Sequence, residues 1–88
     1  MDKKIADIRM TLNILKMRNF KALIFLKEKG KKPFIAAIEG FNYNDDDPKV
    51  ILQKSEETEF PLPDGSPQPD SFILCLKDIH AVDRFRGW

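Results

Sequence analysis

The sequence predicts a mainly β domain, in which an N-terminal α-helix is followed by a five-stranded, strongly bent antiparallel barrel. Four short apolar runs, at 22–26, 34–38, 50–52 and 72–76, and a fifth strand-like segment at 81–85 are separated by Gly, Asn, Asp and Pro residues. Turn-forming residues at such spacing are typical of an antiparallel sheet. Gly40, near the end of the second run, marks a bend or bulge of the kind that lets a short sheet curl.

The first segment is expected to be helical. Its apolar side chains recur at helical spacing and would share one face; they are Ile5, Ile8, Leu12 and Leu15. Asp2 can cap the first turn, and bases such as Lys16 lie late in the segment, which complements the helix dipole. Positions 8 to 14 also alternate apolar and polar residues, so a strand remains the open alternative.

The next segment, 20–29, is expected to be the first strand. A short helix that begins at Asn19 and ends at Gly30 competes with this interpretation. We favour the strand because residues 30–33 form a hairpin-like loop between two apolar segments of similar length, with Gly supplying a positive φ. The second strand then covers residues 34–41.

The rest of the chain supplies a third strand, a loop and two further strands. Residues 55–70 are rich in proline, which predicts a long and mobile loop. A tight turn is expected at 78–80, followed by the last strand at 81–85. The chain is thus expected to be one domain with four parts: a helix in 1–18, three strands in 20–54, the Pro-rich loop 55–70 and two strands in 71–85.

Residues 84–88 end the sequence with two aromatic and two basic side chains. They fit the end of the last strand, with Trp88 closing the barrel, or a tail that docks on a neighbour. The first is more ordinary because a Trp in a small protein is usually buried at least in part.

The size of the chain limits its stability. Folding of 88 residues buries only about 60 to 65% of the unfolded surface. The single Cys excludes an internal disulfide, so oligomerisation is the remaining means of stabilisation. Charged residues interrupt the first thirty positions, and no apolar run approaches the length of a membrane span. We therefore expect a cytoplasmic protein without a membrane partner.

The charges divide along the chain. Residues 1–32 hold ten Lys or Arg against three acids, a net +7, whereas residues 33–88 hold five against eleven, a net −6. A basic face can hold a polyanion, and opposite faces can attract one another between subunits. A solvated surface that only keeps the protein in solution explains the same pattern.

No pattern in the sequence predicts catalysis, a cofactor or a metal site. The loop at 42–47 gathers oxygen ligands, but the central Gly of a calcium loop is Asp47 and the closing Glu is Gln53. Cys75 could act as a nucleophile with His80, yet a thiol inside an apolar strand is usually core. There is no phosphate loop, serine elbow or zinc spacing, so we expect a non-enzyme.

The arrangement of a helix and five strands resembles the Sm-like (LSm, Hfq) family of small, SH3-like barrels. Four segments carry the resemblance: 26–31 looks like the first strand and its Gly turn, 34–42 like the second strand with its Gly-Phe-Asp ending, 50–57 like the third strand and its charged exit, and 74–79 like the end of the second sequence block. These segments span most of the chain.

The resemblance implies a homo-oligomeric ring of about five to seven subunits, in which strand four pairs with strand five of a neighbour. Both strands would otherwise be exposed apolar edges. It also implies single-stranded RNA as the partner, with Tyr43 as a stacking platform. The expected RNA-binding residues are Asn42, Tyr43, Asn44, Lys49, Lys77, Lys3, Lys4 and Arg9.

The candidate site departs from the family pattern. Tyr43 comes one residue early, Lys49 replaces the closing Asn, and Asp78 replaces a Gly that lets backbone approach the ligand. A carboxylate at that position repels phosphate. The alternative is a structural or protein-interaction ring of viral or mobile-element origin, with acidic loops facing a protein partner and no nucleic acid bound.

Overall fold

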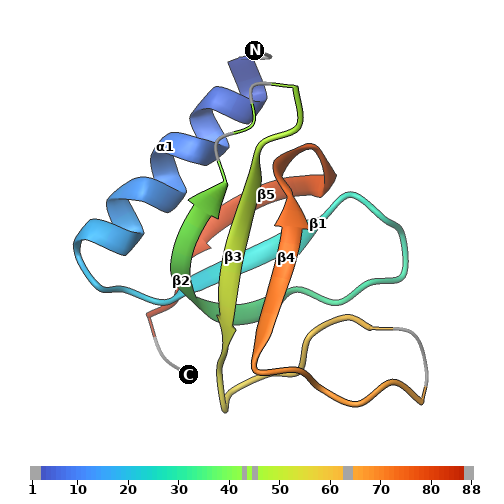
Figure 1. The fold of residues 1–88 in the computed structure, drawn as a ribbon. Helices are drawn as coiled ribbons and strands as arrows, with labels where there is room; N and C mark the ends of the chain where they lie inside the picture. Colours follow the sequence, from blue (N-terminus) through green and yellow to red (C-terminus); the bar gives the residue numbers. More distant parts are fainter. Residues whose placement is uncertain (1–2, 43, 45, 63–64, 87–88) are drawn as a thin grey trace.

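The computed structural model describes residues 3–42, 44, 46–62 and 65–86, and it contains one helix and one five-stranded sheet in these ranges (Figure 1). The elements in chain order are α1 (Lys3–Met17), β1 (Ala22–Leu26), β2 (Phe34–Asn42), β3 (Lys49–Lys54), β4 (Ser71–Cys75), the 3₁₀ turn η1 (Leu76–Asp78) and β5 (Ile79–Arg84). The helix expected at the N-terminus and the strand expected before Gly30 are both confirmed.

Helix α1 forms because its apolar residues line one face, and it ends because Asn19 turns the chain. Ile8, Leu12 and Leu15 are buried against the sheet. Asn19 has a φ of 58°, and the amides of Asn19 and Phe20 donate to the carbonyl oxygens of the last helical turn at 3.1 and 2.9 Å. This left-handed residue with its paired bonds is a Schellman stop. The expected cap, Asp2, lies outside the described residues.

The strands pair in the order β4-β3-β2-β1-β5, and every pair is antiparallel. The expected closed barrel is wrong in one respect, because β4 and β5 do not pair with each other. Trp88, expected to close the barrel, lies outside the described residues. Leu26 at the end of β1, Pro61 and Phe72 of β4 line a cavity of about 280 Å³ beside β4. Strands must approach to about 4.8 Å to share a ladder. The sheet is therefore bent but open.

Two irregularities bend the sheet. The β2–β3 register shifts between Ile38 and Gly40, which confirms the bulge expected at Gly40. A second shift lies between Phe25 and Leu26, where β1 meets β5. A bulge adds local twist and turns the strand, so each shift helps the sheet curve around its own inner face.

The core lies between the concave face of the sheet and α1. Its fully buried side chains come from the helix, from each strand except β4 and from η1; the largest are Phe34, Leu12, Ile24, Leu52, Leu76, Ile79 and Val50. Ile35 is also buried but does not belong to this cluster. Helix α1 packs on β5 and β2, and Figure 1 shows it along the side of the sheet where these two strands lie.

The Pro-rich segment contains no helix or strand in its described part, as expected, and Phe60 holds it against the core. The mobility expected for this loop stays a prediction. Phe60 is 3% exposed, stacks on Phe72 at 5.0 Å and meets Phe34 edge-on at 5.8 Å. The side-chain amide of Gln68 accepts from the Phe60 amide at 2.9 Å and donates to its carbonyl at 3.2 Å. The hydroxyl of Thr58 accepts from the amide of Ile35 at 2.6 Å. The Pro-rich segment therefore contributes a side chain, Phe60, to the hydrophobic core.

The helix of the described structure is too short and too polar to cross a membrane.

Candidate nucleic-acid interface

Three segments meet at one end of the sheet: the β2–β3 loop, η1 and the first turns of α1 (Figure 1). Asn42 and Lys49 face each other where the loop leaves β2 and enters β3. The amide of Leu76 donates to the carbonyl oxygen of Pro48 at 3.0 Å, which fastens η1 to the loop. Helix α1 packs against η1 in turn. The sheet topology thus brings together residues that lie far apart in the sequence.

The β2–β3 loop is shaped by its own polar groups. The side-chain oxygen of Asn44 accepts from the amide of Asp46 at 3.0 Å, and its carbonyl accepts from the amide of Asp47 at 3.2 Å. This is an Asx turn, in which a side chain replaces a backbone partner. Asn42 and Asn44 are exposed, so their amide groups can pair with a base edge. Tyr43, the expected stacking residue, lies outside the described residues.

The electrostatics of this end are mixed. The ammonium of Lys49 lies 3.4 Å from a carboxylate oxygen of Asp47, and the thiol of Cys75 lies 3.7 Å from the same oxygen. The other oxygen of Asp47 is buried without a hydrogen-bond partner among the described residues. Lys77 is exposed beside the exposed Asp78. A phosphate that approaches Lys49 must therefore compete with Asp47, whereas Lys77 is exposed.

The remaining expected residues lie on the helix. Lys3 and Lys4 are exposed in the first turn of α1, and Arg9 is half-buried further along it. The structure therefore gathers Asn42, Asn44, Lys49 and Lys77 at the loop end, and it places the three helix bases (Lys3, Lys4 and Arg9) on the element that packs against η1. The Asp47–Lys49 pair was not expected from the sequence.

The chemistry of Cys75 argues against a nucleophilic role. Burial raises the pKa of its thiol above the ordinary value of 9.0, and the nearby carboxylates of Asp47 and Asp78 raise the pKa further. The thiol therefore stays protonated at neutral pH, when only a thiolate attacks. His80 is exposed on β5. Over the described ranges, no three His, Cys, Asp or Glu side chains gather as metal ligands would.

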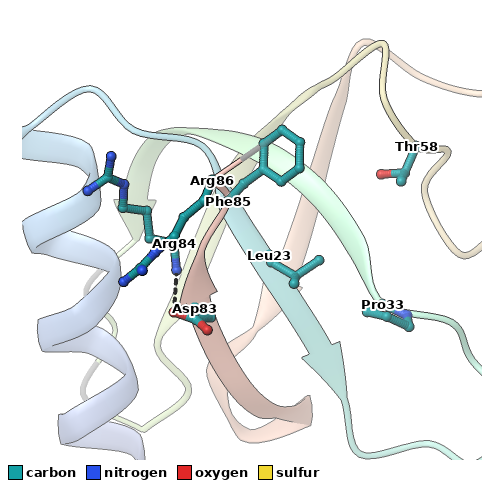
Figure 2. Close-up of a pocket in the computed structure, with 7 residues that line it drawn as sticks. All are labelled: Leu23, Pro33, Thr58, Asp83, Arg84, Phe85 and Arg86. Carbon is teal, nitrogen blue, oxygen red and sulfur yellow. Dashed lines mark hydrogen bonds between the residues drawn. The ribbon is translucent and has the colours of Figure 1, made fainter. Parts of the chain in front are cut away.

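A second concave surface lies on the outer face of β1 and β5 (Figure 2). We call it the outer hollow; it has a volume of about 530 Å³ and is lined by Leu23, Pro33, Thr58, Asp83, Arg84, Phe85 and Arg86. In Figure 2 the Phe85 ring and Pro33 stand on either side of Leu23, while the guanidinium groups of both arginines turn toward α1. Sequence reasoning missed this hollow. The sequence signal that could have revealed it is that β1 carries apolar side chains on both of its faces, so its outer face also offers an apolar surface.

Comparison of the chain with models of known families, with curated proteins and with solved structures gave no match. The fold itself defines the class: a small mainly β domain in which an N-terminal helix covers an open, five-stranded antiparallel sheet.

Proposed function

We propose that this chain is a non-catalytic Sm-like protein that assembles into a closed homo-oligomeric ring and binds single-stranded RNA. The support begins with the strand order, which leaves β4 and β5 at opposite edges of one bent sheet. Only the three residues of η1 separate these two strands in the chain. The family that the sequence resembles closes its rings by pairing strand four of one subunit with strand five of the next.

One observation supports the ring: among the described residues, β4 and β5 each pair with a strand on one side only. The amide of Lys54 donates to Asp70 and that of Phe85 donates to Lys21. Because hydrogen-bonded and non-hydrogen-bonded pairs alternate along antiparallel strands, these bonds fix which amides face outward at each edge. They are Ser71, Ile73 and Cys75 on β4, and Val82 and Arg84 on β5.

The edge of β4 carries no charged residue, whereas β5 carries Asp83 and Arg84 and pairs with β1 across a bulge. Lone edge strands are normally blocked by Pro, by Lys or by covering segments. Strands β4 and β5 contain no Pro or Lys. One outward-facing amide of β5 already has a hydrogen-bond partner, because the amide of Arg84 donates to the carboxylate of Asp83 at 2.7 Å. A ring interface satisfies the remaining groups and removes both edges.

RNA binding is supported by the cations at the loop end. Lys77 and Lys3 are exposed, and a ring repeats each of them once per subunit around one surface. Phosphate contacts add through counterion release, so even a few bases per subunit give strong binding at low salt. Tyr43 supplies the stacking platform, worth about 1 to 3 kcal/mol per base.

The test is binding of a labelled oligouridylate to a sample of known oligomeric state. The affinity is expected to fall steeply between low and high salt, with a slope of about −0.7 per phosphate contact in single strands. Lys77→Ala is expected to weaken binding and flatten the slope. Lys54→Ala is the matched control, since Lys54 is also exposed but lies at the other end of β3. Salt-independent affinity, or equal loss from both variants, would contradict the proposed interface.

One observation favours the alternative of a protein-interaction ring. Carboxylates stand beside two of the expected RNA contacts, Asp47 at Lys49 and Asp78 next to Lys77. A sample that forms the ring but binds no oligouridylate at low salt would select this function. The cytoplasmic location expected from the sequence stays a prediction.

A further inference from the structure

Helix α1 carries a second apolar face, which points away from the sheet. Its members are Met10, Ile14 and Met17, whose side chains are 62%, 47% and 78% exposed. We call this set the outer stripe. Each of the three follows a buried residue of the helix by two positions, which is about 200° around the axis. The outer stripe therefore lies opposite the face that packs on the sheet.

No helix or strand in the described ranges covers the outer stripe. Helix α1 packs mainly on β5, β2 and η1, and Figure 1 shows the sheet on one side of the helix only. Among the described residues, the stripe accounts for all but one of the large apolar side chains that are exposed. A helix that is apolar on two sides is normally buried on both, and contiguous exposed apolar surface marks an interaction site. The outer stripe is therefore expected to have a partner.

We infer that the outer stripe is the docking site for an acidic amphipathic helix of a partner protein. The spacing of four and then three residues is the one with which a helix presents a seam to another helix. The stripe covers two helical turns, about 10 Å, so it matches a short helical segment. Its two methionine side chains are flexible and adapt to the shape of an apolar partner.

The charge around the stripe selects an acidic partner. Residues 3–18 hold five Lys or Arg against one acid, a net +4. Lys16 and Arg18 are exposed directly before and after Met17, and Lys3 is exposed at the other end of the helix. Carboxylates that flank the apolar face of a partner helix can meet these bases. A second copy of α1 would bring like charges together, so self-pairing is disfavoured.

A flat anionic lipid surface fits less well than a helix. Asp7 lies one turn before Met10 on the same side of α1, where a continuous anionic surface would repel its carboxylate. A partner helix can place its own acids away from Asp7 and near Lys16 and Arg18.

The inference goes beyond the proposed RNA binding. Lys16 and Arg18 are not among the residues expected to contact RNA, and the stripe itself is apolar, so a phosphate gains nothing from it. Failure of RNA binding would therefore leave this docking site in place.

Fluorescence anisotropy of a labelled peptide tests the inference. The probe is a designed helix of three heptads with Leu at a and d and Glu at e and g, and its matched peptide has Lys in place of Glu. The wild-type protein is expected to bind the Glu probe and not the Lys probe, with an affinity that falls as salt is added. The double variant Met10→Gln/Met17→Gln keeps helix propensity and is expected to bind the Glu probe at least about tenfold more weakly. Ile73→Gln is the matched control and is expected to bind as the wild type does, since Ile73 is 62% exposed but lies on β4.

Each outcome decides the proposal. Circular dichroism checks that the variants fold, and Ile14→Gln replaces the double variant if that variant does not. A folded wild type that ignores the Glu probe, or binds both probes equally, would overturn the inference. So would equal losses from the α1 and β4 variants. Self-association that the double variant abolishes would assign the stripe to a second copy, and binding to phosphatidylserine vesicles that it abolishes would assign the stripe to lipid; either result would overturn the acidic helix.

Discussion

A single proline on the free edge of β4 is expected to disrupt assembly while preserving the subunit fold. The side chain of Ile73 is 62% exposed, and its amide faces away from β3, because the hydrogen bond from Lys54 to Asp70 places Ile73 at a non-hydrogen-bonded pair. Proline is tolerated at such an edge position. Ile73→Pro therefore removes one donor from the proposed interface without breaking the β3–β4 ladder.

The size of the effect follows from one lost donor per interface. An acceptor left unsatisfied on burial costs about 1 to 3 kcal/mol, and about 1.4 kcal/mol corresponds to a tenfold change in affinity. Each interface is therefore expected to weaken by roughly 5- to 150-fold. In a ring every subunit takes part in two interfaces, so the loss recurs around the assembly.

Sedimentation velocity over a range of concentrations measures this change. Ile73→Pro is expected to dissociate at a higher concentration than the wild type, with an unchanged circular dichroism spectrum. Ile73→Thr, which keeps both the amide and β-branching, is the control for the lost apolar side chain. A folded proline variant that dissociates at the same concentration as the wild type would refute the role of this edge.

Three further substitutions test how the fold is held together. Phe60→Ala is expected to cost about 3 to 5 kcal/mol in urea unfolding, because Phe60 plugs the core; a cost below about 1 kcal/mol would show that the Pro-rich segment is dispensable. Asn19→Ala is expected to be less stable than Asn19→Gly by about 1 kcal/mol, because Asn19 holds a positive φ; equal stabilities would contradict the Schellman stop. The hydrogen bond from Lys21, with a smaller effect from the backbone amide of Glu57, lowers the pKa of Glu57 below 4.5. A lowered pKa contributes stability above the unfolded value that is lost as the pH falls through the folded value. Glu57→Gln is therefore expected to be less stable than the wild type above about pH 4.5 and to converge with it in acid, and a constant difference across this range would count against the ion pair.

Local pattern was enough to predict the helix and the five strands, but the turn expected at 78–80 lies earlier, at Leu76–Asp78, and β5 begins at Ile79. The helical spacing of Ile8, Leu12 and Leu15 gave α1 its buried face, and Gly30 and Gly40 marked a turn and a bulge that the structure contains. Such features depend on a few neighbouring residues, whose backbone preferences and spacing are visible in the chain itself.

Features that depend on distant contacts were not predictable. Phe60 is an isolated apolar residue among acids and prolines, and only the rings of Phe34 and Phe72 explain its burial. The open sheet depends on where β4 and β5 lie relative to each other, at the two ends of the strand order. Periodicity within one segment carries no information about either.

The candidate site was predictable only in part, because some of its features depend on the fold as a whole and others on local packing. The strand order determines that the β2–β3 loop and η1 meet, so Asn42, Lys49 and Lys77 could be expected at one end. The contact of Lys49 with Asp47 depends on the conformation of the loop, and the outer hollow depends on the packing of Pro33 and Phe85 across two strands.

Native mass spectrometry of the wild-type chain tests the account most directly. If the edges of β4 and β5 pair between copies and the ring closes, a single stoichiometry of about five to seven subunits is expected. A monomer at micromolar concentration, or an open series of sizes that grows with concentration, would contradict the closed ring on which the proposed function depends.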